Sequence, residues 1–376
     1  MSANHSSFGQ VSATMPSLRW TYLFWGVAGA VLIAIHAALA LLSMDFEAGG
    51  ESLIGRPVLS FVALELLACG VFLLAVGVVP SGPRETPLYA WVIIVGIALR
   101  ATMIVSTPIL ENDYLRYLWD GAVAANGWSP YRFSPEAVLQ GFSTVPHELL
   151  RLGDEGRAIL SEISYPHLRT IYPPVAQAAF AIAHFLKPWS LTSLRLVFLL
   201  FDAATLLLLI AALRSLDRSP LWIVIYWWNP LIVKEFVNSA HLDVITFPLV
   251  VGAVMLAVRQ RYVWGAGSLA LATGAKLWPV VILPVILSPL WRRPARLIAP
   301  LTLFVLIAGV LSIPILRAGL DTSSGFVAYA KTWEMNDALY MLFFWAVQFL
   351  LSIFQLDAGT RDRRVRTRSN YGSDPS

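Results

Sequence analysis

Long apolar runs constrain the fold of this chain more than any other feature of its sequence. Trp20 to Met44, Pro57 to Val79 and Leu88 to Leu110 are each long enough to cross a bilayer, because a transmembrane helix needs about 20 residues. The 376 residues are 57% hydrophobic and 13% charged, with a mean hydropathy of +0.67, which leaves too little polar surface for a soluble domain. The sequence therefore predicts an all-α, polytopic transmembrane protein.

The distribution of charge excludes one class of partner. The net charge of +4 comes from basic residues that gather in short loops and in the C-terminal tail, where a membrane topology places them. We therefore expect no nucleic-acid partner. The single cysteine, Cys69, lies in an apolar run, so the chain has neither a disulfide framework nor a cysteine-based metal site.

Further apolar segments follow the first three, for a total of about 10–11 membrane segments. The two runs 172–187 and 191–213 lie between an outer and an inner loop, which permits only an odd number of crossings, so we expect the run that begins at Tyr172 to enter the membrane only partway. The alternative is that the inside and outside assignments are wrong beyond residue 190. We expect residues 1–19 to be a cytoplasmic arm, 20–356 the transmembrane domain and 357–376 a basic, disordered cytoplasmic tail. The predicted segments after the third are 172–187, 191–213, 221–233, 244–258, 262–275, 277–290, 297–316 and 339–356.

The first strongly polar stretch, Glu111 to Tyr131, is predicted to be a short helix at the outer membrane surface. Asn112 or Asp113 can cap its start, and Gly127 and Pro130 follow where it should stop. With the N-terminus inside, this stretch belongs to a catalytic extracytoplasmic loop, residues 111–171. One or two further surface helices are expected in the amphipathic segment 147–163.

Two acids and a base share one face of that helix. Asp113, Arg116 and Asp120 are spaced i, i+3 and i+7. An Asp in a first helical turn is also stabilised by backbone N–H groups alone, but that effect does not explain the other two charges. The neighbouring Tyr114, Tyr117, Leu118 and Trp119 are expected to form an aromatic surface in the headgroup region, so the stretch suggests a reaction at the bilayer surface.

A second polar cluster follows an apolar segment that ends at Pro230. Asn238, His241 and Asp243 offer the amide, imidazole and carboxylate groups that hold a hydroxyl-rich substrate. Their spacing matches no metal signature, although the residues leave a divalent metal open. Lys276 is a point charge suited to a phosphate, or an interfacial lysine that reaches water. Trp333, Glu334 and Asn336 can form a sugar-stacking edge.

Ionisable residues inside the apolar segments are costly and need partners. Glu65 and Arg100 have comparable depth on the second and third segments, and we expect them to form a structural pair, with a phosphate contact of Arg100 as the alternative. Asp202 and His36 are also intramembrane, without an evident partner.

Five segments of the sequence resemble one family in the same order. NDYLRYLWDG with GWSPY, then YPPVAQ, YWWNPLIVKEFVNSAHLD, ATGAKLWPVVILP and KTWEMND, resemble bacterial integral-membrane glycosyltransferases of the GT-C superfamily, most of all glycosyltransferase family 87 and mannosyltransferase-like members. The resemblance runs from Tyr89 to Tyr340. It implies an enzyme that moves a hexose, first of all mannose, from a polyprenyl-phosphate sugar to an extracytoplasmic glycan or glycolipid acceptor, with inversion.

The resemblance also assigns roles to individual residues. Asp113 matches the acidic residue of the first catalytic loop and is the expected general base, supported by Arg116 and Asp120. Lys276 matches the basic residue near the donor phosphate. Tyr172, Pro173 and Pro174 would begin the helix that edges the lipid groove. The expected substrate-binding residues are Tyr114, Tyr131, Tyr172, Glu235, Asn238, His241, Asp243, Lys276, Trp333 and Asn336.

Two alternatives remain from the sequence. A transporter or flippase would use Glu65, Arg100 and Asp202 as an ion or substrate path, and it predicts internal repeats that we do not find. Family members usually continue through further spans after about Asp357, so a truncated, inactive relative is the other alternative. The expected setting is the cell membrane, with the lipid bilayer, a polyprenyl-phosphate sugar and an acceptor as partners and with no cofactor assigned.

Overall fold

The computed structural model describes residues 18–46, 55–79, 86–332 and 341–352, and these residues form helices and turns without any strand. The predicted all-α fold class is confirmed. Contacts divide the chain into two units, Met1–Val327 and Ala328–Ser376. The second unit contains the apolar helix Met341–Ser352, which covers the described part of the predicted segment 339–356.

Four helical stretches of the described residues are long and apolar enough to cross a membrane. They are Arg19–Phe46, Val58–Gly77, Leu191–Ser215 and Pro294–Ala318. Shorter apolar helices accompany them, at Pro87–Met103, Pro174–Leu186, Asp243–Val258, Trp278–Leu290 and Met341–Ser352. Helix length and composition therefore agree with the predicted polytopic membrane protein.

The helices are numbered in chain order. Their bounds are α1 (Leu18–Leu42), α2 (Val58–Gly77), α3 (Thr86–Met103), α4 (Asp113–Ala125), α5 (Pro135–Leu139), α6 (His147–Glu155), α7 (Arg157–Leu160), α8 (Pro174–Leu186), α9 (Leu191–Ser215), α10 (Val224–Trp227), α11 (Pro230–Val233), α12 (Asp243–Val258), α13 (Tyr262–Thr273), α14 (Leu283–Leu287), α15 (Ile298–Ala318) and α16 (Gly325–Thr332). Short turns between them are η1 (Ser43–Phe46), η2 (Pro220–Ile223), η3 (Lys234–Asn238), η4 (Trp278–Ile282), η5 (Ser288–Leu290) and η6 (Pro294–Arg296).

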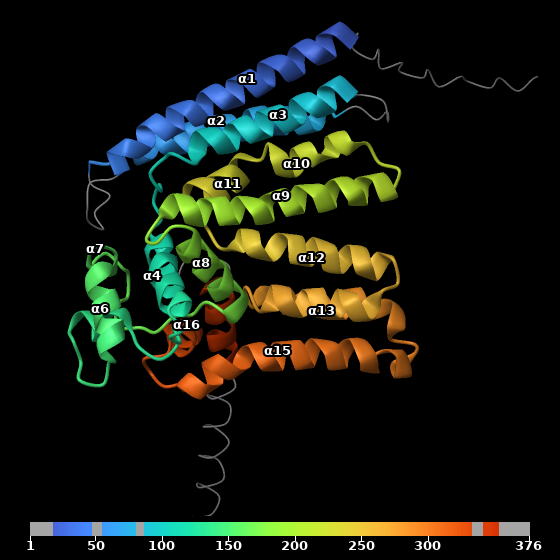
Figure 1. The fold of residues 1–376 in the computed structure, drawn as a ribbon. Coiled ribbons are helices and arrows are strands. Elements are labelled where there is room, and N and C mark those ends of the chain that lie inside the picture. The colour runs from blue at the N-terminus through green and yellow to red at the C-terminus, as the bar shows by residue number, and fades with distance from the viewer. Residues whose placement is uncertain (1–17, 47–54, 80–85, 333–340, 353–376) are drawn as a thin grey trace, which may run out of the picture. The chain divides into compact units, whose positions relative to one another are not determined.

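The long helices form a row, and the polar helices cross one end of it. Within the first unit α9, α12, α13 and α15 pack side by side in that order, while α1 packs on α2 and α3 (Figure 1). Helices α4 and α8 pack against each other across the end of the row where α12 begins (Figure 1). They approach closely at Gly121, where an added Cβ would lie 2.5 Å from the carbonyl oxygen of Phe180. The chain therefore requires glycine at this contact.

The third apolar segment ends earlier than predicted. Helix α3 stops at Met103, seven residues before the expected end at Leu110. Pro108 disfavours helix at the residue before it, and Leu110 has a positive φ of 58°, so the chain turns here. The non-helical residues 104–112 carry the chain from α3 to α4.

The predicted segment 221–233 is wrong as a continuous span. The structure has the turn η2 and the helices α10 and α11 there, followed by η3, a π-helical turn. Pro230 explains the break after α10, because proline cannot continue a helix but suits the first position of the next one. The segment from Tyr172 was expected to enter the membrane only partway, and α8 there has 13 residues, fewer than a full crossing needs.

The predicted surface helices of the segment 147–163 are confirmed as α6 and α7. Apolar residues of α6 and α7 pack with Trp119 and Val138 in a separate small core. Trp189 closes this core by stacking on Trp119, with ring centroids 6.4 Å apart. The connecting region between α4 and α8 is therefore a folded part of the protein.

The predicted pair of Glu65 and Arg100 is wrong, because Arg100 pairs with Asp202 of α9. The Arg100 guanidinium donates to both carboxylate oxygens of Asp202, and the Tyr226 hydroxyl donates to Asp202 at 2.6 Å. Arg100 also lies over the Trp227 ring, 3.4 Å from its centroid. The Glu65 oxygens are buried without a hydrogen-bond partner among the described residues.

Arg100 and Asp202 therefore form a structural contact that joins α3 to α9. These are two of the three residues on which the transporter alternative rests. His36, the other intramembrane polar residue, uses its Nδ1 to hydrogen-bond the Leu32 carbonyl oxygen of its own helix at 2.8 Å. This contact orients the imidazole against its own helix, while Nε2 is buried without a hydrogen-bond partner among the described residues.

Candidate active site

The first site element is the start of α4. The helix begins at Asp113 and ends at Ala125, and Gly127 follows with a positive φ of 79°, as predicted for its end. Asn112 occupies the N-cap position, but its side chain makes no capping bond and instead donates to the Ser164 hydroxyl at 2.8 Å. Asp113 is half-buried in the first turn of the helix, and the Tyr117 hydroxyl lies 3.5 Å from its carboxylate.

Arg116 and Asp120 lie on the same helix as Asp113 but point into the protein. Arg116 donates to the carbonyl oxygens of Leu168 and Tyr165, at 2.9 and 3.0 Å. Asp120 is 1% exposed and accepts from Gln177 at 3.0 Å. Burial raises the pKa of Asp120, against the opposing charge of Arg116. Both side chains fix α4 to its neighbours.

The prediction that the aromatic residues of α4 face the headgroup region is wrong. Tyr117, Leu118 and Trp119 are buried in the protein and do not face a headgroup region. Tyr117 stacks on Phe180 of α8 with ring centroids 4.6 Å apart. The reason is the close packing of α4 on α8, which sequence periodicity does not reveal.

Tyr131 and Tyr172 form a joint between the loop after α4 and the start of α8. The Tyr131 hydroxyl donates to the Tyr172 carbonyl oxygen at 2.8 Å. The Tyr172 ring meets the Tyr117 ring edge to face, with centroids 4.9 Å apart. Helix α8 begins at Pro174 with Pro173 as its N-cap residue, as predicted.

Asn238 holds the turn between α3 and α4. Its side chain accepts from the Ile109 N–H at 2.9 Å and donates to Ser106 and Thr107, and the residue is 0% exposed. The amide is therefore used within the protein and has no free face for a sugar. A positioning role replaces the direct substrate contact that the sequence suggested.

Arg195 of α9 supports the same turn and was missed in the sequence. Its guanidinium donates to the Ile104 and Ser106 carbonyl oxygens, both at 2.7 Å, and to the Asn238 carbonyl oxygen. The available signal was a lone arginine near the start of an apolar segment, which needs partners there. Together with Asn238, it sets the direction in which the chain enters Glu111.

His241, Asp243 and Lys276 form one connected polar group. The His241 Nδ1 lies 2.5 Å from Asp243 Oδ2, and the Lys276 ammonium donates to both Asp243 oxygens, at 2.7 and 2.8 Å. Asp243 opens α12 and Lys276 follows the end of α13, so the antiparallel packing of these helices joins residues 33 positions apart. All three side chains are partly exposed.

Glu111 completes the site, although the sequence analysis gave it no role. Glu111, Asp113 and His241 each present one oxygen or nitrogen, and these atoms lie within 4.8 Å of one another. Two carboxylates and an imidazole are suitable ligands for a divalent cation. The available signal was the E-x-D spacing just before α4. The positive charge of Lys234 acts on Glu111 and favours its ionised form. The Lys234 ammonium itself pairs with Glu235 at 3.0 Å.

The charges of the site change one another's protonation. Burial and the neighbouring Asp113 raise the pKa of Glu111. Burial alone would lower the pKa of His241, but its hydrogen bond to Asp243 and the Asp243 charge outweigh it and raise that pKa. Burial likewise opposes ionisation of Asp243, yet His241 and Lys276 lower its pKa to about 2. The site thus alternates negative and positive groups.

The structure therefore brings Asp113, His241, Asp243 and Lys276 into one polar group. Glu235 and Tyr114 are partly buried near the ends of their elements. Trp333 and Asn336, the predicted sugar-stacking edge, lie outside the described residues. So do most of the predicted cytoplasmic arm and the whole predicted tail.

A comparison with family models matches residues 23–292, well over half of the chain, to the N-terminal domain of alpha-(1->6)-mannopyranosyltransferases, the MptA/B family. The chain belongs to this family. The matched region contains Glu111, Asp113, His241 and Lys276, the residues that the fold brings together. Neither the curated proteins nor the solved structures give a match. For this mannosyltransferase family member, mannosyl transfer is the supported activity and the bilayer its supported setting.

Proposed function

We propose that the chain is a GT-C-type membrane mannosyltransferase that moves a mannosyl group from a polyprenyl-phosphate donor to a hydroxyl of an extracytoplasmic glycan or glycolipid. The observation that carries the proposal is the convergence of Glu111, Asp113 and His241, with Lys276 held beside them through Asp243. This group combines a proton acceptor with a cation, which are the two functions that the transfer requires. Family membership supports the sugar.

The reaction is one displacement at the anomeric carbon. Asp113 takes the proton of the acceptor hydroxyl while the oxygen of that hydroxyl forms the new bond to the anomeric carbon. The bond from the carbon to the phosphate oxygen breaks, and its electron pair leaves with the polyprenyl phosphate. A single displacement inverts the anomeric centre. General-base assistance of this kind contributes about 10²- to 10⁴-fold to the rate.

Lys276 is the cation best placed for the leaving phosphate. Its side chain is 39% exposed while its ammonium is held by Asp243, so the charge is both positioned and accessible. A fixed cation stabilises charge as it develops on the phosphate. Arg100 and Arg116, the other candidates from the sequence, are committed to Asp202 and to loop carbonyl oxygens. We assign these two arginines to positioning.

The ends of α12 and α13 support an extracytoplasmic site. Asp243 begins α12 and Lys276 follows α13, whereas Arg259 and Arg261 lie in the turn that joins the opposite ends of the two helices. Basic residues favour the cytoplasmic side of a membrane. The acidic cluster at the other end is then outside, where a lipid-linked sugar donor is used.

Transfer from alternative mannose donors tests this proposal. Membranes that contain the full chain, and membranes from an empty vector, are given labelled polyprenyl-phosphate mannose or labelled GDP-mannose, each with and without a chelator. The proposal predicts label transfer from the lipid-linked donor only and an anomeric configuration opposite to that of the donor. Transfer from GDP-mannose alone would contradict the donor assignment, and retention would contradict the single displacement. The chelator arm reports whether a cation takes part.

A further inference from the structure

The three residues that converge in the candidate active site have the geometry of a metal ligand set. Glu111, Asp113 and His241 each offer one oxygen or nitrogen, and these atoms lie within 4.8 Å of one another. Ligand atoms lie about 2.0–2.2 Å from an ion such as Zn²⁺, so two ligands of one ion are at most about 4.4 Å apart. Small side-chain rotations therefore suffice to bring all three atoms onto one ion. The three residues are also partly exposed, so an ion can reach them.

The two carboxylates of this group have no counter-charge within the protein. Among the described residues, neither Glu111 nor Asp113 forms an ion pair. The nearby lysines are each paired with another acid, in the pairs Lys276–Asp243 and Lys234–Glu235. A divalent cation would balance the two remaining negative charges and remove the repulsion between them.

The imidazole of the group is held in the way that a metal ligand is held. Asp243 binds His241 Nδ1, so Nε2 is the ring nitrogen left for an ion. A metal-ligating histidine usually binds a carboxylate through its other nitrogen, because this contact fixes the tautomer and the direction of the ring. The Lys276 ammonium holds the same carboxylate in turn. The contact between Asp243 and His241 thus supports a metal site independently of the spacing of the three ligand atoms.

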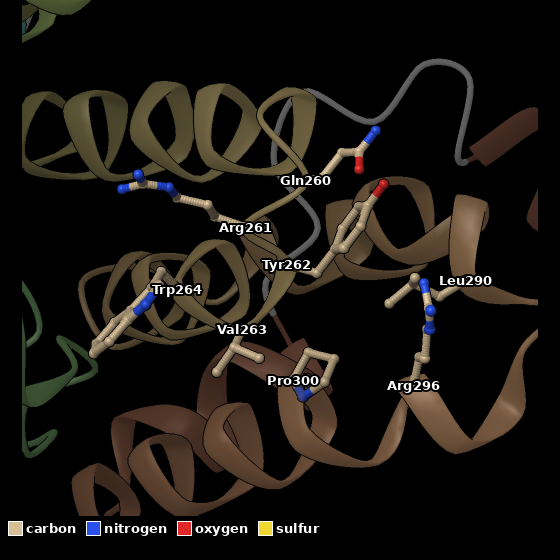
Figure 2. A pocket seen from close by; sticks show the side chains of 8 residues that line it. All are labelled: Gln260, Arg261, Tyr262, Val263, Trp264, Leu290, Arg296 and Pro300. Carbon is tan, nitrogen blue, oxygen red and sulfur yellow. The ribbon is translucent and has the colours of Figure 1, made fainter.

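A cavity at the opposite ends of α12 and α13 offers a contrast. It measures about 400 Å³ and includes the turn after α12 and the start of α13 (Figure 2). Its lining residues are Gln260, Arg261, Tyr262, Val263, Trp264, Leu290, Arg296 and Pro300. None of these residues carries a carboxylate or an imidazole, and the two charged ones are basic. Of the two ends of this helix pair, a cation is therefore favoured at the end where Asp243 begins α12.

We propose that Glu111, Asp113 and His241 bind a divalent first-row transition-metal ion, such as Zn²⁺ or Mn²⁺. The imidazole favours this class over Mg²⁺ and Ca²⁺, which prefer oxygen ligands. Three protein ligands leave a coordination position open, and a phosphate oxygen of the lipid-linked donor can occupy it, a role that rests on the proposed function. A carboxylate can bind an ion through one oxygen, so the second oxygen of Asp113 stays available for the acceptor proton.

Titration of the full chain with Mn²⁺ tests the site without any transfer reaction. The protein is purified in detergent without a polyhistidine tag and stripped with a chelator, and free Mn²⁺ is measured by electron paramagnetic resonance. We expect one bound Mn²⁺ per chain, which Zn²⁺ displaces at a lower concentration than Ca²⁺ does, because imidazole ligands favour Zn²⁺. Stripped protein that binds no Mn²⁺ would overturn the proposal, and so would displacement by Ca²⁺ as effective as that by Zn²⁺.

Matched variants locate the ion. Loss of an outer partner of a metal ligand costs about 10- to 100-fold in affinity, so we expect that loss for Asp243→Asn and a larger one for Glu111→Gln and His241→Gln. The controls Asp154→Asn and His167→Gln change an exposed carboxylate and an exposed imidazole outside the site and should bind Mn²⁺ as the wild type does. Circular dichroism checks that each variant keeps its helices. Wild-type affinity in a folded Glu111→Gln protein would overturn the assignment.

Polyprenyl phosphate separates the metal site from the proposed function. Added polyprenyl phosphate should tighten Mn²⁺ binding, whereas polyprenol, which lacks the phosphate, should not. Equal effects of the two lipids would overturn the role of the ion at the donor phosphate. A chain that binds Mn²⁺ as expected but transfers no mannose would contradict the proposed function and leave the metal site standing. Mannosyl transfer by a chain that binds no Mn²⁺ would have the opposite meaning.

Discussion

The His241 Nδ1 and the Asp243 carboxylate lie 2.5 Å apart, and this contact joins the two halves of the candidate active site. With Asp243 ionised, Nδ1–H donates to it, which leaves Nε2 as the ring's other polar atom. Lys276 binds the same carboxylate. Asp243 therefore positions an imidazole and an ammonium group at once, although it is not itself part of the group formed by Glu111, Asp113 and His241.

Replacing Asp243 should damage transfer by releasing both of its partners. Asp243→Asn removes the charge that holds His241 and Lys276, and we expect kcat/KM to fall at least about 10-fold, as when a carboxylate that orients a histidine is lost. Initial rates of mannosyl transfer in membranes measure the effect. The matched control is Asp154→Asn on α6, because Asp154 is exposed and pairs with Arg157 in a surface contact. Equal rates in both variants would contradict the role of Asp243.

Lys276→Gln should slow the chemical step by removing the cation proposed for the leaving phosphate. We expect kcat to fall by about 100-fold, the usual effect of losing one group that stabilises transition-state charge. Lys276→Arg should recover part of the rate because it restores the charge. Exposed Lys187 at the end of α8 provides the control Lys187→Gln. A wild-type kcat in Lys276→Gln would assign the leaving phosphate to another group.

Breaking the buried pair between α3 and α9 should destabilise the protein. Arg100→Met leaves the Asp202 carboxylate buried without its cation, which costs about 3–5 kcal/mol of unfolding free energy. The apparent Tm of the detergent-solubilised protein should fall accordingly. Adding Asp202→Leu removes the stranded charge, so the double variant should have a higher Tm than Arg100→Met. A double variant less stable than either single variant would contradict this account.

The stabilisation from the His241–Asp243 contact should depend on pH in a defined direction. The folded-state pKa of His241 is raised above its ordinary value of 6.5, so its contribution is fully present below pH 6.5 and is lost as the pH rises through the folded value. The pKa of Asp243 is about 2, so its own contribution is constant above about pH 4.

Thermal unfolding checks this direction. The Tm difference between the wild type and His241→Gln, measured from pH 5.5 to 9, should be largest at the acid end and shrink as the pH rises. The same comparison with His167→Gln, a change outside the site, should not vary in this way. A Tm difference that grows with pH would contradict the raised pKa of His241.

The sequence was sufficient for the fold class, and it picked out several of the polar residues that the structure brings together. Apolar length alone predicted α1 and α2 to within a few residues, and the density of polar groups beside apolar runs picked out Asp113, His241, Asp243 and Lys276. These signals are local, because each depends on residues that are neighbours in the chain. Such local signals predict the individual helices and polar segments, but they do not predict which of these segments pack together.

The misses at Arg100, at Asn238 and on the aromatic face of α4 depend on contacts between distant segments. Glu65 and Arg100 have comparable depth, but only the packed structure shows that Arg100 faces α9, where Asp202 lies. Asn238 looked like a sugar ligand because the sequence cannot reveal that the turn after α3 uses its whole amide. The aromatic face of α4 looked interfacial for the same reason, since its burial comes from α8 and from the small core that contains α6 and α7.

The central claim is that Asp113 removes the proton of the acceptor hydroxyl, and a transfer rate measures it most directly. Wild type, Asp113→Asn and the control Asp154→Asn are compared for initial transfer from labelled polyprenyl-phosphate mannose, at matched protein levels in membranes. The account predicts a loss of about 10²- to 10⁴-fold in Asp113→Asn alone. A wild-type rate in Asp113→Asn would contradict it.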